Sequence, residues 1–253
     1  MQIVHAKRAL TADGWQSDLE IRINTAGLID FVGPFSRPPS HLTALLLPAP
    51  VNLHSHTFQR AMAGLTEARG PDPQDSFWSW RRLMYRFLDQ LTPDHVEAIA
   101  AQVFMEMLEA GYGAVAEFHY LHHAKGGTPY DNVAEMSERI VAAAIETGIG
   151  LTLLPVLYQF GGCDKRPLSG GQRRFGNDVE RFRQLHDVAT AYVAHSPEDF
   201  TIGVAPHSLR AVDPDGFHAI LENAVSGPLH MHLAAQMAEV DAVQAHPSAR
   251  PTD

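Results

Sequence analysis

Apolar runs and helix-patterned segments alternate five times in this chain, and that alternation limits its fold more than any other feature. The apolar runs predict strands at 45–53, 113–118, 150–157, 201–205 and 228–232. Helix signals fall between them, such as Thr92-Pro93, where an N-cap hydroxyl precedes a proline suited to the first helical turn. This alternation is typical of a parallel sheet with crossover helices.

Polar residues gather where the predicted strands end, the edge at which parallel α/β folds place their active sites. His54 and His56 end the first strand, and residues i and i+2 of a strand point to the same side. Two such imidazoles can hold one metal ion, and imidazole suits zinc. For a bare His-x-His pair, two ordinary surface histidines are the alternative. The other strand ends carry His119 and Tyr120, His207 and Arg210, and His232.

A barrel and a doubly wound sheet would both place ligands at the strand ends. No Gly-rich phosphate loop of the G-x-G-x-x-G or P-loop kind follows any predicted strand, which favours the barrel. We therefore expect an α/β fold, a (β/α)₈ TIM-type barrel that is incomplete, with about five β/α units in residues 47–253. Residues 1–46 show short strand patterns and predict part of a small N-terminal β-sandwich.

Composition narrows the expected partners and location. A formal net charge of −10 favours neither nucleic acid nor an anionic membrane surface as a partner. The single cysteine, Cys163, excludes an internal disulfide and fits a reducing cytoplasm. No apolar run reaches the about 18 residues of a membrane helix, and residues 1–8 show no signal-peptide core. We expect a cytoplasmic protein that binds a small molecule. Whether the chain forms a homo-oligomer is left open by the sequence.

Several longer motifs connect the chain to a known family. They are residues 52–65 around the His-x-His pair, Phe-Trp-Ser-Trp-Arg at 77–81, Glu-Phe-His-Tyr-Leu-His-His at 117–123, Gly-Gln-Arg-Arg-Phe at 171–175 and Ala-Pro-His-Ser-Leu-Arg at 205–210. The His-x-His pair alone would indicate only an amidohydrolase. With the tryptophan-arginine and Pro-His-Ser-Leu-Arg segments, the chain resembles the formimidoylglutamate (N-formimino-L-glutamate) deiminases of the amidohydrolase superfamily over essentially its whole length.

The resemblance implies zinc-dependent hydrolysis of N-formimino-L-glutamate to N-formyl-L-glutamate and ammonia, a step of histidine degradation. It implies one Zn²⁺ per site, although other divalent metals are open. The residues it assigns to metal binding are His54, His56 and His232, and those it assigns to substrate binding are Gln59, Arg81, Tyr120, His207 and Arg210. The two arginines suit a dicarboxylate substrate, because guanidinium groups recognise carboxylates in a bidentate manner.

The chain departs from the family pattern after the fifth predicted strand. The family carries His-x-Ala-Glu-Gln there, and its glutamate moves protons between water and the leaving nitrogen. Here Ala235 occupies that position, and Glu239 is expected not to reach the same point. No catalytic residue is therefore assigned, and losing a positioned acid–base group costs roughly 10²–10⁴-fold in rate.

The barrel that the resemblance implies needs more strands than the sequence provides. Five units are used by residue 253, so the catalytic histidine of strand six and the metal-binding aspartate of strand eight have no counterpart here. We therefore expect open barrel edges, uncovered apolar faces and little or no deiminase activity in this chain.

Two other functions remain in competition. The first is a non-catalytic fragment or pseudoenzyme that binds ligand or a complete subunit, which Ala235 favours. The second is another aminohydrolase, such as a guanine deaminase. Arg81 and Arg210 argue against the second, because a neutral purine would not need two guanidinium groups.

Overall fold

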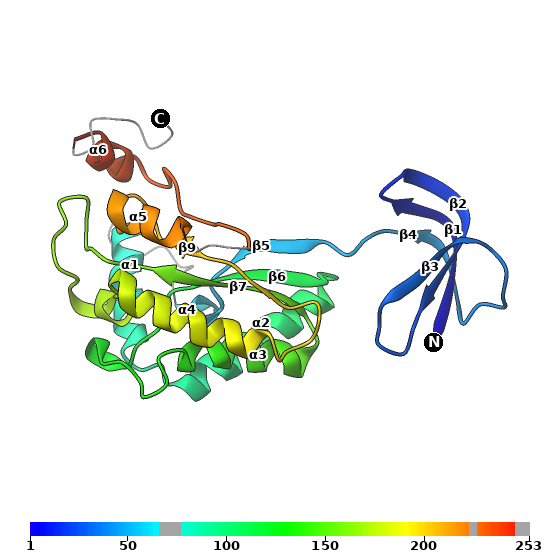
Figure 1. Cartoon of the computed structure of the whole chain (residues 1–253), viewed down its shortest axis with the longest axis horizontal. Coiled ribbons are helices and arrows are strands. Elements are labelled where there is room, and N and C mark those ends of the chain that lie inside the picture. The colour runs from blue at the N-terminus through cyan, green and yellow to red at the C-terminus, as the bar shows by residue number, and fades with distance from the viewer. Residues whose placement is uncertain (66–76, 223–226, 246–253) are drawn as a thin grey trace. The chain divides into compact units, whose positions relative to one another are not determined.

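The structure is a computed structural model that describes residues 1–65, 77–222 and 227–245, apart from the side chains of 77–79, 81 and 82 (Figure 1). The chain divides into two compact units, Met1–Pro50 and Val51–Asp253. Residues 47–50, which are two prolines and two apolar residues, separate the last strand of the first unit from the first strand of the second.

The first unit is a four-stranded sheet with the order β3-β2-β1-β4. Its strands are β1 (Gln2–Thr11), β2 (Gly14–Ile23), β3 (Ile29–Pro34) and β4 (His41–Leu46). The hairpin between β1 and β2 pairs Thr11 with Gly14, and Gly14 has a φ of 90°, which glycine adopts at little cost. β4 pairs with β1 in parallel, and Ala6, Ala9, Leu19 and Ile21 form the small buried cluster of this unit.

The prediction of one strand over 45–53 is wrong. Residues 41–46 belong to the first unit as β4, and β5 (Val51–Ser55) begins the parallel sheet of the second. Pro48 and Pro50 explain the interruption, because proline has no N–H to donate to a strand ladder.

The second unit is built on a parallel sheet with the order β5-β6-β7-β8, and a further short strand, β9, also pairs with β7. Its other strands are β6 (Ala114–His119), β7 (Gly150–Leu157), β8 (Thr201–Ile202) and β9 (Ala205–Pro206). The sheet is the predicted α/β arrangement, and the barrel is not closed. Along the edge strand β5, Val51 and Leu53 are 49% and 67% exposed, as expected for an open barrel edge.

Two strand predictions at the far end of this sheet need correction. The predicted strand 201–205 is interrupted between β8 and β9, and 228–232 is no strand but makes one isolated parallel bridge, Val204 to Leu229. Pro228 starts that segment and cannot donate to a ladder, while Gly203 lies so close to it that a Cβ would meet the Pro228 carbonyl oxygen.

Helices connect the strands and cover the sheet. They are α1 (Phe77–Leu88), α2 (Pro93–Glu109), α3 (Glu135–Thr147), α4 (Val179–Val193), α5 (Pro214–Leu221) and α6 (Met237–Ala245), with 3₁₀ turns η1 (Thr57–Met62), η2 (Lys125–Gly127) and η3 (Gly170–Arg174). The predicted start of α2 is confirmed, since the Thr92 side chain accepts a hydrogen bond from the His95 amide. Gly148 ends α3 in the left-handed conformation.

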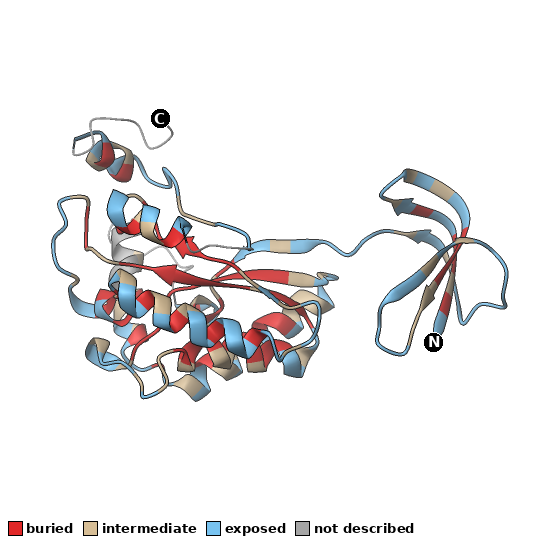
Figure 2. Cartoon of the chain, viewed as in Figure 1, coloured by how far each residue is buried: buried red, intermediate tan, exposed pale blue. Residues whose placement is uncertain are grey.

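The core lies between the parallel sheet and the helices α2, α3 and α4 on one side of it (Figure 1). β6 and β7 are buried along almost their whole length, and the helices turn their buried faces toward them (Figure 2). Strands buried on both faces read as continuous apolar runs, which is why these two were predictable. Within the described ranges, no helix is long and apolar enough to span a membrane.

Candidate active site

Three histidines from distant parts of the chain meet at the carboxyl ends of the parallel strands. His54 lies on β5, His56 follows it, and His232 comes from the segment after α5. The His54 Nε2 atom is 3.2 Å from His56 Nε2 and 3.1 Å from His232 Nε2. One nitrogen from each ring lies within 4.8 Å of the other two. The structure therefore brings together the three residues that the sequence analysis named as metal ligands.

The neighbouring strand β6 orients these rings. The His56 Nδ1 atom lies 2.9 Å from the Phe118 carbonyl oxygen. A carbonyl oxygen only accepts, so Nδ1 carries the hydrogen and Nε2 keeps its lone pair for a metal. The buried Phe118 ring contacts all three imidazoles, with centroid distances of 5.2 Å to His54, 5.4 Å to His56 and 4.4 Å to His232.

Glu117, the residue before Phe118, holds the chain on both sides of His56. Its carboxylate is fully buried, and one oxygen accepts from the Thr57 amide at 2.8 Å and the Thr57 hydroxyl at 2.9 Å. Burial raises the pKa of Glu117, while hydrogen bonds from Ser55 and Thr57 oppose the rise. Sequence reasoning missed this residue, and the signal was a carboxylate inside an otherwise apolar strand.

The electrostatics of the triad favour neutral imidazoles. Burial, with the nearby histidines adding to it, lowers the pKa of His56 to about 3 and that of His232 to about 4. The pKa of His54 is also lowered, by burial first and then by His230. Metal ions bind the neutral form of histidine, so the site needs no proton to be displaced at neutral pH.

The geometry of the three rings fits a zinc ion. Two ligand atoms on a tetrahedral zinc with bonds of about 2.1 Å lie roughly 3.4 Å apart. This is close to the 3.2 Å and 3.1 Å that separate the His54 nitrogen from those of His56 and His232. Three histidine nitrogens also match the donor set of zinc sites that keep one position open for water. Metal binding by these residues stays a prediction.

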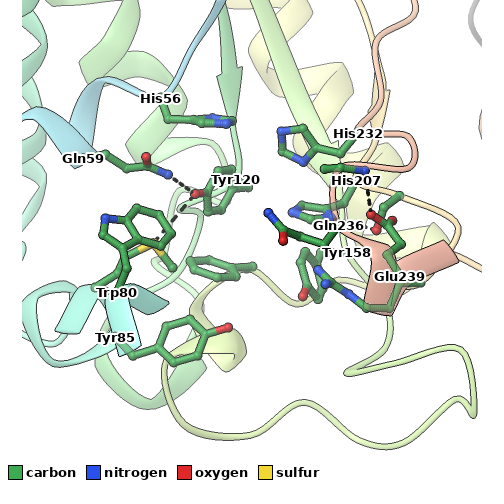
Figure 3. Close-up of a pocket in the computed structure, with 15 residues that line it drawn as sticks. His56, Gln59, Trp80, Tyr85, Tyr120, Tyr158, His207, His232, Gln236 and Glu239 are labelled. Atoms are coloured by element: carbon green, nitrogen blue, oxygen red, sulfur yellow. Dashed lines mark hydrogen bonds between the residues drawn. The ribbon is translucent and has the colours of Figure 1, made fainter. Parts of the chain in front are cut away.

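A cavity of about 210 Å³ lies beside the triad and contains most of the predicted substrate residues (Figure 3). Gln59 and Tyr120 lie on one side of it, and the Gln59 side-chain amide donates to the Tyr120 hydroxyl at 2.6 Å. Burial, the largest of several influences, raises the pKa of Tyr120, so it is a neutral phenol at ordinary pH. On the other side lies His207, whose Nδ1 atom is 3.1 Å from the Ser208 hydroxyl oxygen.

Two arginines, Arg81 and Arg210, were predicted to bind the substrate. Arg210 lines the cavity, and its buried Nε atom has no hydrogen-bond partner among the residues that the structure describes. Arg81 lies on α1, but its side chain is outside the described residues. Its role in substrate binding therefore stays a prediction from the sequence.

Arg174 in the 171–175 motif does not line this cavity but supports the wall. Its fully buried guanidinium donates to the carbonyl oxygens of His123, Leu88 and Leu91. These contacts connect the end of α1 to the loop after β6. Gly171 is equally constrained, because a Cβ there would lie 2.8 Å from the Tyr85 ring.

The expectation that Glu239 does not reach the point of the family's glutamate stays a prediction, but Glu239 is closer to the site than its spacing from His232 suggested. Its side chain lines the cavity together with His232 and Ala235, and one carboxylate oxygen is 3.3 Å from the Ala235 amide nitrogen. α6 begins at Met237, so a side chain in its first turn can fold back over the segment that precedes the helix.

An open parallel barrel whose strand ends carry a histidine triad is an arrangement typical of metal-dependent hydrolases. The profile of the amidohydrolase family matches residues 45–252, and that of the N-terminal domain of formimidoylglutamate deiminase HutF matches residues 1–34. The chain belongs to the amidohydrolase family. Within this family it is 44% identical over 254 residues to a formimidoylglutamate deiminase from Pseudomonas aeruginosa, covering 99% of this chain and 55% of that protein.

The chain is also similar to two further proteins. An amidohydrolase from Brucella melitensis, known from its crystal structure, aligns with a TM-score of 0.92 and 44% identity, over 99% of this chain and 56% of that one. An 8-oxoguanine deaminase from Pseudomonas aeruginosa is 24% identical over 91% of this chain and 51% of that protein. The chain thus spans about half the length of the curated relatives it matches.

Proposed function

We propose that this chain forms the metal-binding and substrate-binding part of a formimidoylglutamate deiminase site, with zinc as the metal. The observation that carries the proposal is the meeting of His54, His56 and His232 at a cavity that also contains Arg210. The similarity to a deiminase of that name supports the choice of substrate. The substrate would be a small molecule with two carboxylates and one amidine.

The side chains of the cavity divide the work. Zinc held by the three histidines would supply water of lowered pKa for attack on the amidine carbon. Arg210 offers its unpaired Nε–H group to a substrate carboxylate, and the Gln59–Tyr120 pair offers neutral hydrogen-bonding groups nearby. Aromatic side chains line much of the remaining wall.

Ala235 supports a second candidate, a non-catalytic binding chain. Alanine has no group that can accept a proton from water or give one to the leaving nitrogen. If Ala235 limits the reaction, substrate would bind while ammonia release stays slow. The two candidates share their ligand and differ only in turnover.

The proposal also assigns the reaction to a metabolic pathway and a cellular compartment. We place it in the degradation of histidine and in a reducing cytoplasm, which the single cysteine, Cys163, supports. A net charge of −10 supports a small-molecule ligand over nucleic acid.

The test combines binding with turnover in the 253-residue chain. The zinc-loaded chain should bind N-formimino-L-glutamate more tightly than 8-oxoguanine, and a chelator should weaken that binding. Ammonia release would identify a deiminase, whereas zinc-dependent binding without ammonia would identify the non-catalytic chain. Equal affinity for the amino-acid derivative and the purine would contradict both.

A further inference from the structure

Glu239 is the one acidic side chain that lines the cavity among the residues that the structure describes. It lies in the first turn of α6, is 8% exposed, and faces the cavity from the same side as His232 and His207 (Figure 3). Across the cavity lie Gln59 and Trp80. A ligand bound there would therefore meet one carboxylate, on the wall that also carries His232.

The surroundings of Glu239 leave its negative charge available. The described residues form no ion pair with its carboxylate, which accepts one long hydrogen bond, of 3.3 Å, from the Ala235 amide. Burying a carboxylate without a cation is unfavourable unless a partner arrives.

We propose that Glu239 binds the protonated amidine end of the substrate and so distinguishes an amidine from an amide. This inference rests on the proposed function. An amidinium group is planar and carries parallel N–H donors, so a carboxylate can accept from it as it does from a guanidinium. Arg210 would hold a carboxylate of the same substrate, which makes the two charges of the cavity complementary to the two ends of the ligand.

Helix capping is the alternative role for this side chain. A glutamate in the third position of a helix often accepts a hydrogen bond from a backbone amide before the first turn, as Glu239 does from Ala235. Glutamine can fill that capping role equally well. Glu239→Gln therefore keeps the cap and removes the charge, which separates the two roles.

The experiment measures two ligands against three forms of the full, zinc-loaded chain. N-formimino-L-glutamate carries the amidine, and N-formyl-L-glutamate is its neutral amide counterpart with the same carboxylates. Binding is followed by intrinsic fluorescence in rapid mixing, before turnover, in the unmodified chain, Glu239→Gln and Asp241→Asn. Asp241 is exposed on the same helix, so its variant removes an equal charge away from the cavity.

Glu239→Gln should weaken binding of the amidine about 10- to 100-fold and leave binding of the amide nearly unchanged. Asp241→Asn should change neither. An equal effect of Glu239→Gln on both ligands, or none, would overturn the assignment of Glu239 while leaving the proposed function intact. Failure of the unmodified chain to bind either ligand would instead overturn the proposed function, and this inference with it.

Discussion

The Glu117 carboxylate accepts hydrogen bonds from both the backbone amide and the side-chain hydroxyl of Thr57, at 2.8 Å and 2.9 Å. Thr57 follows His56 directly, and Phe118, which follows Glu117, accepts from the His56 ring. Two consecutive residues of β6 thus fix the backbone and the imidazole of one predicted metal ligand. Such supporting contacts tune metal affinity as well as stability.

Replacing Glu117 should therefore lower zinc affinity. We expect Glu117→Gln to weaken zinc binding about 10-fold or more, because outer contacts of metal ligands typically contribute 10- to 100-fold. Thr57→Val, which keeps the backbone amide, should have a smaller effect. Zinc affinity is measured by competition with a chromophoric chelator, and circular dichroism verifies the fold.

The matched control for this series is Glu97→Gln. Glu97 pairs with Arg139 at 2.9 Å on the helical side of the unit, and its loss should leave zinc affinity unchanged. Equal zinc affinity in Glu117→Gln and Glu97→Gln would show that Glu117 stabilises the fold without positioning the ligand.

Arg210 should determine affinity for the carboxylate end of the ligand. We expect Arg210→Met to weaken binding of N-formyl-L-glutamate about 10- to 100-fold, because a charge-assisted hydrogen bond is lost. Arg210→Lys should recover only part of it, since an ammonium cannot bind a carboxylate in a bidentate manner. Arg166→Met, which removes an arginine whose side chain is 63% exposed, is the control. Unchanged affinity in Arg210→Met would remove Arg210 from the site.

The first unit has its own buried charge, Glu20. Its carboxylate accepts from Arg22 Nε at 2.6 Å and from the amides of Ser36 and Arg37 at 2.6 Å and 2.9 Å. Burial acts to raise the pKa of Glu20, but these hydrogen bonds outweigh it and lower the pKa from 4.5 to about 2. A depressed folded-state pKa stabilises the fold above the unfolded pKa, and this contribution is lost as the pH falls.

The contribution of Glu20 to stability should therefore decrease at low pH. The difference in thermal midpoint between the unmodified chain and Glu20→Gln should be full above pH 4.5 and shrink as the pH approaches about 2. Asp18→Asn, which breaks an exposed pair with Lys7, should change the midpoint little at any pH. A difference for Glu20→Gln that is independent of pH would contradict the account.

Arg173 and Arg174 are neighbours with opposite roles. Arg174 is fully buried and donates to three carbonyl oxygens, whereas Arg173 is exposed. We expect Arg174→Met to lower the free energy of unfolding by about 3 kcal/mol, since buried acceptors lose charge-assisted bonds. Arg173→Met should change it by less than about 0.5 kcal/mol. Denaturant unfolding of the two variants measures the difference, and similar values would contradict the buried role.

Sequence reasoning succeeded where residue spacing determines geometry. The His54–His56 pair and the buried strands β6 and β7 follow from the period of a strand and from continuous apolar runs. The meeting of His232 with this pair was expected from a family resemblance and from a predicted strand at 228–232, which the structure reduces to one bridge at Leu229.

The failures have physical causes as well. Residues 45–53 form one apolar run that divides between two sheets. Apart from its two prolines, nothing in the local sequence distinguishes this run from one continuous strand. Glu117 was read as part of a strand and of a family motif but was given no role, since its partner Thr57 is 60 residues away. The place of Glu239 in the cavity wall was also missed, because spacing along a helix does not show that a first-turn side chain folds back.

Zinc binding by the histidine triad tests the central claim most directly. Isothermal titration of the unmodified chain with zinc should show one site, and His56→Ala and His232→Ala should each weaken it at least about 100-fold. His195→Ala, which removes an exposed histidine at the end of α4, should leave the affinity unchanged. Zinc binding of equal strength in His56→Ala, His232→Ala and the unmodified chain would contradict the account.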